Sequence, residues 1–315
     1  MKTYAPNYYE KFRCIAGECR NSCCIGWDVY IDDETLEKYE TMSGEIGKRV
    51  RSHIKEKEDG ICFEMCADGK CPLLNERGLC DIILEKGEDF ISEICTEHPR
   101  FYNFFSDRTE AGLGLSCEEA ARIILSQAEK FSLILLDDDG TEENTSQRDQ
   151  NFFALREKIF EALQNKKIPL DERARKMLAI AGAKFPRKNS REWVDILRGL
   201  EIMDPAWKKD IGVLCAPCFG GGDVSEHDTA FEKLLIYFVY RHTAEAADEL
   251  DFAARICFAY LGFRVIRALC LAKKSSEGKC TFEDLCDFAR RYSAEIEYSP
   301  ENTATLLEMM EAYNG

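Results

Sequence analysis

The chain has 315 residues, and its 58 acidic and 42 basic side chains give a formal net charge of −16 at pH 7. This length can bury a sizeable core and is typical of two domains. The acidic balance argues against a nucleic-acid partner, because phosphate binding calls for basic patches. It fits a basic protein partner, although solubility alone accounts for it equally well.

No apolar run approaches the roughly 20 residues of a membrane helix, and the N-terminus lacks the apolar stretch of a secretory signal. We therefore expect no membrane partner and a cytoplasmic location. Thiols stay reduced there, and clustered cysteines more often bind metal than form disulfides. A secreted disulfide protein is the alternative, but such scaffolds are usually much shorter.

The polar segment 137–150, DDDGTEENTSQRDQ, reads as a linker or long loop. No cysteine occurs between Cys117 and Cys215, so cysteine usage changes across this segment. We predict a cysteine-rich domain at 1–137, a linker at 138–149 and a helical domain at 150–315.

The second half has helical periodicity. Ser225 with Asp228, and Thr281 with Asp284, have the spacing of residues that cap helices. Apolar residues recur at helical intervals after both, and again over 253–269. Cys257 and Cys286 lie on these apolar stripes, which predicts that they are small core residues and not ligands.

The first half shows strand patterns. Residues 27–31 alternate as a short strand would, 101–105 and 111–115 flank a predicted turn at 106–108, and 131–136 is a further strand candidate. The predicted fold is mainly α: a helical C-terminal domain and a cysteine-rich N-terminal domain with short strands or hairpins.

The cysteines themselves are the main functional signal. Two of them, Cys23 and Cys24, are adjacent, which suits a site where neighbouring thiolates enter one pocket or serve two. The N-terminal set is Cys14, Cys19, Cys23, Cys24, Cys62, Cys66, Cys71, Cys80, Cys95 and Cys117.

Local sequence around these cysteines favours ligation. Cys14-x4-Cys19-x3-Cys23-Cys24 is compact and has Gly17 and Gly26 nearby, which lets backbone amides approach the sulfurs.

A predicted turn at 75–78 would bring Cys71 and Cys80 together. Ser116 and Glu119 form a capping box that would place Cys117 in the first turn of a helix, where a thiolate is favoured.

The spacing matches neither the paired Cys-x2-Cys units of common zinc sites nor the bacterial ferredoxin run. Cys62-x3-Cys66-x4-Cys71 approaches the pattern of radical enzymes that use S-adenosylmethionine, but its last interval is wrong. Spacing alone predicts a multi-thiolate metal or cluster site and leaves the metal open.

Several motifs together resemble the start of bacterial flagellin lysine-N-methylases, and share features with a broader cysteine-cluster family described as zinc- or iron-chelating. The resemblance covers roughly 9–125. It is carried by YEKFRCIAGEC at 9–19, SCCIGWDVYID at 22–32, GKCPLL at 69–74, GLCDI at 78–82, Cys95 with His98-Pro99-Arg100, and LSCEEAAR at 115–122.

The resemblance implies methyl transfer from S-adenosylmethionine to lysine side chains of flagellin, or of another lysine-bearing protein, with a bound [4Fe-4S] cluster. Cys62 and Cys66 look like additions in this chain. Eight positions carry the match as candidate metal ligands: Cys14, Cys19, Cys23, Cys24, Cys71, Cys80, Cys95 and Cys117.

Eight thiolates exceed the four that one cluster uses, so some are structural or a second metal such as zinc is present. The sequence does not divide them. One alternative is a non-catalytic zinc- or iron-binding protein with a helical partner-binding domain. Another is a redox or metal-delivery protein that uses Cys215 and Cys218.

Other candidates for the site have a structural interpretation as well. His98 could be a ligand or a base, or could simply end a helix. Aromatic residues that could line a lysine pocket, or only pack, are Tyr8, Tyr9, Trp27, Tyr102 and Phe104.

Overall fold

The computed structural model describes the whole chain except residues 142–143, 215–218 and 220–221. The structure is 56% helical, with a four-stranded and a two-stranded sheet, which confirms the mainly α prediction. Cys215 and Cys218, the candidate redox pair, lie outside the described residues. No helix in the described part combines the length and apolarity of a membrane span.

The chain forms two compact units, which we call the helical unit and the cysteine-rich unit. The helical unit comprises Met1–Phe12, Tyr102–Ser116 and Ala120–Gly315, and the cysteine-rich unit comprises Arg13–Phe101 and Cys117–Glu119. These boundaries differ from the predicted domains because the first strand pairs with strands later in the chain. The predicted domains at 1–137 and 150–315, with a linker at 138–149, stay a prediction.

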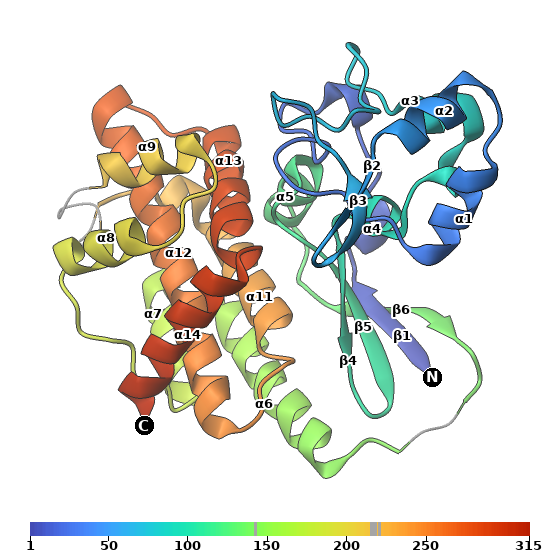
Figure 1. Ribbon diagram of the computed structural model, residues 1–315. Helices are drawn as coiled ribbons and strands as arrows, with labels where there is room; N and C mark the ends of the chain where they lie inside the picture. Colours follow the sequence, from blue (N-terminus) through green and yellow to red (C-terminus); the bar gives the residue numbers. More distant parts are fainter. Residues whose placement is uncertain (142–143, 215–218, 220–221) are drawn as a thin grey trace. The chain divides into compact units, whose positions relative to one another are not determined.

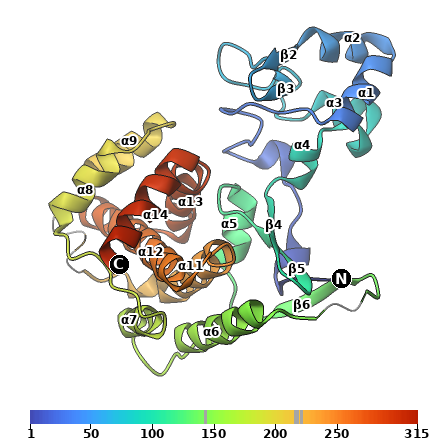
Figure 2. The same cartoon turned by 60° about the horizontal axis from the view of Figure 1, so that its bottom comes forward.

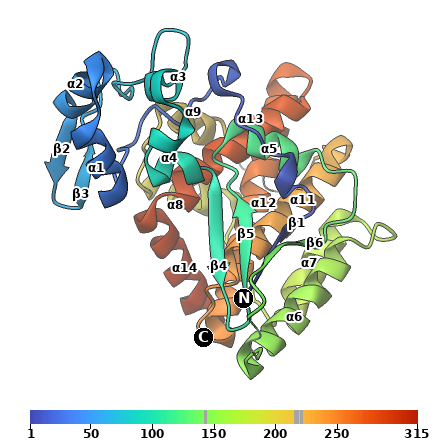
Figure 3. The ribbon, with the colours of Figure 1, turned by 90° about the vertical axis from the view of Figure 1, so that its right-hand side faces the viewer.

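The four-stranded sheet has the strand order β4-β5-β1-β6, and Figure 3 shows β4 and β5 side by side. β1 is parallel to β5, with Lys2 opposite Arg108, and antiparallel to β6, with Pro6 opposite Leu133. The strands are β1 (Lys2–Pro6), β4 (Arg100–Phe104), β5 (Arg108–Leu113) and β6 (Leu133–Asp138).

Around α12, the longest of the described helices, pack α7, α9, α11, α13 and α14 (Figure 1). Gly262 permits this packing, because a Cβ there would lie 2.8 Å from the Phe238 ring on α11. The helices of this unit are α5 (Glu118–Leu125, which begins in the cysteine-rich unit), α6 (Gln147–Leu163), α7 (Leu170–Ile180), α8 (Ser190–Gly199), α9 (Pro205–Val213), α11 (Asp228–His242), α12 (Glu249–Glu277), α13 (Phe282–Tyr292) and α14 (Pro300–Asn314).

A buried ion pair connects the sheet to these helices. Arg156 on α6 donates to both carboxylate oxygens of Glu110 on β5, at 2.7 and 2.6 Å. The two side chains are 4% and 0% exposed. The guanidinium also lies over the rings of Phe152 and Tyr240. Neither charge can return to water, so each depends on the other.

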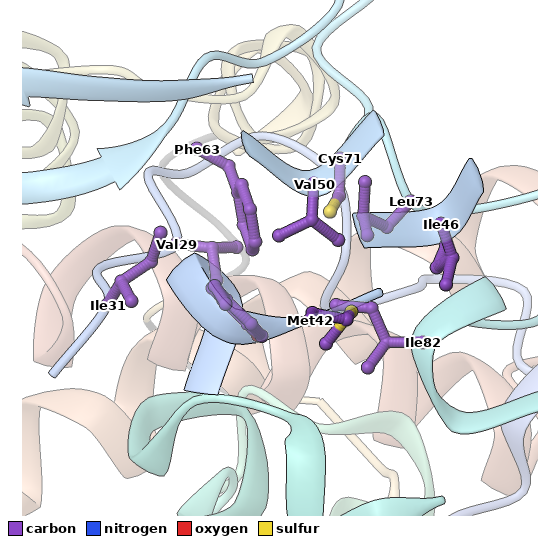
Figure 4. Packing of buried hydrophobic residues seen from close by; sticks show 10 residues of the cluster. Val29, Ile31, Met42, Ile46, Val50, Phe63, Cys71, Leu73 and Ile82 are labelled. Carbon is purple, nitrogen blue, oxygen red and sulfur yellow. The ribbon is translucent and has the colours of Figure 1, made fainter. Parts of the chain in front are cut away.

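The cysteine-rich unit contains short helices and one hairpin, which Figure 2 shows beside α1 and α2. Its elements are α1 (Asp33–Thr41), α2 (Gly44–Ser52), β2 (Ile54–Lys57), β3 (Gly60–Phe63), α3 (Asp81–Lys86) and α4 (Glu93–Glu97). One apolar cluster forms its core (Figure 4): Val29, Ile31, Tyr39, Met42, Ile46, Val50, Phe63, Cys71, Leu73 and Ile82.

Several predicted elements are confirmed. β4 and β5 form the predicted hairpin, and β6 overlaps the candidate strand at 131–136. Thr281 and Asp284 make a reciprocal capping box at α13. Cys257 and Cys286 are buried on α12 and α13, as their positions on apolar stripes predicted.

Two local predictions are wrong. Residues 27–31 form no full strand; Tyr30 makes an isolated antiparallel bridge to Cys62 on β3, beside the hydrogen bond from Ile31 N to Ile61 O at 2.8 Å. Ser225 does not cap α11, because its hydroxyl donates to Asp223 and the chain there is a 3-10 turn.

We predict that Glu110→Gln lowers the free energy of unfolding by about 3–5 kcal/mol, because it leaves the Arg156 charge buried without its counter-charge. Chemical denaturation followed by circular dichroism measures the loss. The control is Glu172→Gln, which breaks an exposed ion pair with Lys176 on α7 and should cost less than about 0.5 kcal/mol. Equal losses for both variants would contradict a special role for the buried pair.

Candidate metal centre

The first cysteine loop, Cys14 to Cys24, is built from turns instead of regular structure. A 3-10 turn covers Ala16–Glu18, and the Ala16 amide donates to the Cys14 sulfur at 3.4 Å. Gly17 lies against the second cysteine loop, because a Cβ there would come within 2.6 Å of the Arg77 carbonyl oxygen. Glycine therefore allows the two loops to touch.

The second loop pairs with the first through the backbone. The Cys71 amide donates to the Cys24 carbonyl at 2.8 Å, and the Gly26 amide donates to the Gly69 carbonyl at 2.9 Å. The predicted turn at 75–78 is present, closed by Gly78 N to Asn75 O at 2.9 Å with Gly78 at φ +70. Leu74 and Cys80 then face each other across a β-bridge.

Four cysteines gather beside the apolar cluster, and we call them the inner sulfur group: Cys24, Cys71, Cys80 and Cys95. Cys71 belongs to the cluster, and the other three pack against it. Figure 4 shows the Cys71 sulfur near Val50 and Leu73. Each of these four cysteines interacts electrostatically with the other three.

Burial raises the pKa of three inner thiols: that of Cys71 to about 12, that of Cys95 to about 11, and that of Cys80 in the same direction. Protons therefore stay on these sulfurs unless a cation replaces them.

The other four candidates form an outer sulfur group: Cys14, Cys19, Cys23 and Cys117. Cys23 interacts electrostatically with Cys14 and Cys117, and Cys19 interacts with Cys14. Cys14 and Cys23 are exposed, whereas Cys19 and Cys117 are partly buried.

Glu118 connects the first cysteine loop to Cys117 through hydrogen bonds. Its carboxylate accepts hydrogen bonds from the backbone amides of Arg20 and Asn21 at 3.1 and 3.2 Å, and from both side chains. The Cys19 sulfur lies 3.8 Å from the same carboxylate. Since Glu118 directly follows Cys117, these bonds hold residues 19–21 next to Cys117. The sequence did not indicate this role, because there Glu118 is only one residue of the motif at 115–122.

The adjacent pair joins the two groups. The Cys23 thiol donates a hydrogen bond to the Cys24 sulfur, which raises the pKa of Cys23 and lowers that of Cys24 to about 6. Ser22 also favours the Cys24 thiolate by a hydrogen bond. The thiolate is the form that ligates metal.

All eight predicted ligands thus belong to one unit, and their donor chemistry fits four-thiolate sites. Among the described residues, however, no three Cys, His, Asp or Glu side chains are arranged so that one metal ion could contact them together. Ligation therefore requires the sulfurs of a group to move closer together than they lie here.

Cys62 and Cys66 lie apart from both groups. Cys62 is buried on β3, with Lys57, Asp28 and Lys55 as its electrostatic neighbours. Cys66 is exposed beside Lys70.

Ser116 has no capping role in the structure, whereas His98 caps the C-terminal end of α4, which agrees with the helix-ending interpretation. Ser116 does not form the predicted cap, since its buried hydroxyl has no hydrogen-bond partner in the described structure. Cys117 precedes α5 instead of lying in its first turn. Burial lowers the pKa of His98 to about 4, and its ring lies 6.0 Å from that of Trp27.

The helical unit contains a separate pocket of about 440 Å³. Aromatic rings form one wall: Phe152 lies 5.3 Å from Phe105 and 6.1 Å from Phe252. Acidic side chains also line it, including Asp248 and Glu249 at the start of α12. None of the predicted pocket aromatics Tyr8, Tyr9, Trp27, Tyr102 and Phe104 lines it.

A second polar network in this unit is closed to solvent. The buried carboxylate of Glu297, in a π-helical turn at Ser293–Glu297, accepts hydrogen bonds from Tyr237 and pairs with His242 and Arg241. Its members come from two distant segments, so no local sequence pattern indicates it.

Comparisons with known proteins agree with the motifs. Residues 218–315 match the family model described as the FliB lysine N-methylase C-terminal domain. The lysine-N-methylase of Salmonella typhimurium strain LT2 is 28% identical over 134 residues, 41% of this chain and 33% of that protein. The lysine-N-methylase of Salmonella choleraesuis gives the same identity and coverage. The flagellar biosynthetic protein FliU of Salmonella muenchen is 25% identical over 41% of this chain and 79% of its own length.

The match thus spans a third of the length of the two lysine-N-methylases, and no solved structure matches the chain. The family model covers the C-terminal part, where the sequence showed only helical character, while the cysteine motifs lie at the N-terminal end. Both findings relate this chain to lysine N-methylases, through the family model over residues 218–315 and through the Salmonella relatives over 41% of its length.

Proposed function

We propose that this protein is a protein-lysine N-methyltransferase that transfers methyl groups from S-adenosylmethionine to lysine side chains of flagellin. The observation that carries the proposal is the coincidence of two features: relatives named lysine-N-methylase and eight clustered thiols. The FliU relative adds a connection with flagellar assembly. We place the reaction in the cytoplasm, where the thiols stay reduced.

The cysteines supply a [4Fe-4S] cluster site in this proposal. A cluster needs four thiolate ligands, and each of the two sulfur groups contains four cysteines. When bound, the cluster would supply a redox-active, charged centre. The Cys24 thiolate, favoured by Cys23 and Ser22, is the ligand most readily available.

Lysine methylation needs the neutral amine, whereas a free lysine has a pKa near 10.4. Roughly three pKa units, on the order of 4 kcal/mol, separate that from neutral pH. Burial of the amine among apolar groups lowers this cost, because it disfavours the cation. Carboxylates have the opposite effect on the amine, so acidic residues serve docking more than proton removal.

The pocket of the helical unit fits such docking. Its aromatic wall can cover an aliphatic lysine chain and attract its cation. Asp149 is a carboxylate with a lowered pKa, so it stays negatively charged at neutral pH. Burial raises the pKa of Asp149, but hydrogen bonds from Ser106 and Ser146 outweigh burial and lower the pKa overall. Asp248 and Glu249 belong to the segment that matches the lysine N-methylase C-terminal domain. We therefore assign lysine docking to this pocket.

Methyl transfer is tested by incubating anaerobically purified protein with flagellin, S-adenosylmethionine and a reductant. We expect mass spectrometry to find flagellin lysines heavier by one or more methyl groups. The double variant Cys23→Ser/Cys24→Ser should lose both the modification and the bound cofactor. The matched control Cys66→Ser, an exposed cysteine outside both groups, should keep them.

Unmodified flagellin with the iron-loaded protein would contradict the proposal. A colourless protein that holds zinc after anaerobic reconstitution with iron and sulfide would favour the non-catalytic metal-binding alternative.

Lysine docking is tested by Asp248→Asn with Glu249→Gln. The asparagine would retain the cap of α12, since Asn and Asp cap about equally well. The KM for a lysine-bearing flagellin peptide should rise on the order of fivefold, corresponding to about 1 kcal/mol shared by two exposed charges. The kcat should change little, because these charges aid binding and not proton removal.

The control removes two charges from helix starts outside the pocket, by Glu283→Gln with Glu301→Gln on α13 and α14. This control has the same net charge as the Asp248→Asn/Glu249→Gln variant. It should leave the KM for the flagellin peptide unchanged. A rise in KM of the same size in both double variants would show that bulk charge, and not the pocket, governs docking.

A further inference from the structure

The eight candidate ligands divide into two sets of different character, which the sequence could not separate. All six pairs within the inner sulfur group (Cys24, Cys71, Cys80 and Cys95) interact electrostatically, and its members contact one apolar cluster. The members of the outer sulfur group (Cys14, Cys19, Cys23 and Cys117) interact with one another and do not belong to that cluster.

The backbone supports this division. The hydrogen bond from Cys71 N to Cys24 O places those two residues side by side, and the turn at 75–78 returns Cys80 to them. Cys95 lies on α4, whose start is fixed by a 2.8 Å hydrogen bond from the Glu93 amide to Asp32. Three separate segments, the two cysteine loops and α4, therefore meet at the inner group, which is typical of a closed structural site.

The outer group has a different construction. Three of its cysteines lie within ten residues, and the fourth is held to them by Glu118. Cys14 and Cys23 are exposed, so other molecules can reach this group. A centre that takes part in methyl transfer must be reached by its reactants, whereas a metal closed in an apolar core cannot be.

We propose that the inner group binds one structural zinc ion, and that the outer group separately holds the iron–sulfur cluster. The outer assignment rests on the proposed function; the inner one does not. In tetrahedral zinc thiolate sites the sulfurs lie roughly 3.8 Å apart, from a Zn–S distance of about 2.3 Å. Zinc would thus draw the four inner sulfurs together and cross-link segments that the small core alone holds weakly.

The test measures metal content, absorption near 400 nm and thermal unfolding of the full chain, purified anaerobically and reconstituted with zinc, iron and sulfide. The wild type should contain about one zinc and four iron atoms per chain. Cys80→Ser should lose the zinc and unfold at a temperature roughly 10 °C or more lower. Cys117→Ser should lose the iron and the 400 nm absorption, keep the zinc and unfold within a few degrees of the wild type.

Two control variants guard against a general loss of structure. Cys80→His should retain zinc and the unfolding temperature, because zinc accepts three cysteines and one histidine. Cys66→Ser should retain both metals. If Cys80→Ser does not fold, retention of zinc by Cys80→His together with loss of iron from Cys117→Ser still supports two separate sites.

The inference is overturned if Cys117→Ser releases zinc and iron together, if Cys117→Ser keeps its iron, or if the wild type binds no zinc. None of these readouts uses methylation. A protein with both metals in the stated sites but without methyl transfer to flagellin would therefore refute the proposed function and leave the two-site division standing.

Discussion

The hydrogen bond from the Cys71 amide to the Cys24 carbonyl is the contact on which the cysteine-rich unit depends. It joins two loops that have almost no regular structure of their own, at the point where one cysteine of each enters the core. Gly17 makes a second contact possible, because any larger residue would strike the Arg77 carbonyl. With these contacts in place, the turn at 75–78 and the packing of α4 are enough to gather four thiols.

The sequence predicted those features that depend on neighbours in the chain. The turn at 75–78, the β4–β5 hairpin and the Thr281 capping box follow from local residue preferences, and all are present. The segment 27–31 was misjudged because its alternating apolar residues, Val29 and Ile31, face a small core from an irregular chain and not from a sheet. Alternating apolar residues indicate that one side of a segment is buried. A loop that lies beside β3 also buries one side, so the same alternation does not require a strand.

The candidate site was predicted as a set of residues but not as an arrangement. The resemblance of the motifs selected the eight cysteines, since those motifs can be read from order along the chain. Their division depends on which segments meet in space, and Cys24 and Cys95 are separated by most of the cysteine-rich unit. The role of Glu118 was hidden for the same reason: its partners, Arg20 and Asn21, lie almost a hundred residues earlier. The same limit applies to the pocket, whose rings come from β4–β5, α6 and α12.

The adjacent cysteines carry a consequence for any metal that binds. Consecutive residues cannot move independently, so fixing Cys24 in the inner group also restricts where Cys23 can lie in the outer one. In the structure the Cys23 thiol donates a hydrogen bond to the Cys24 sulfur, and a metal bound to Cys24 would remove that acceptor. Cys23 would then be released to ligate in the outer group. Occupation of the inner group would in this way prepare the outer group, and a protein lacking the inner metal would hold the outer one poorly even with every outer cysteine intact.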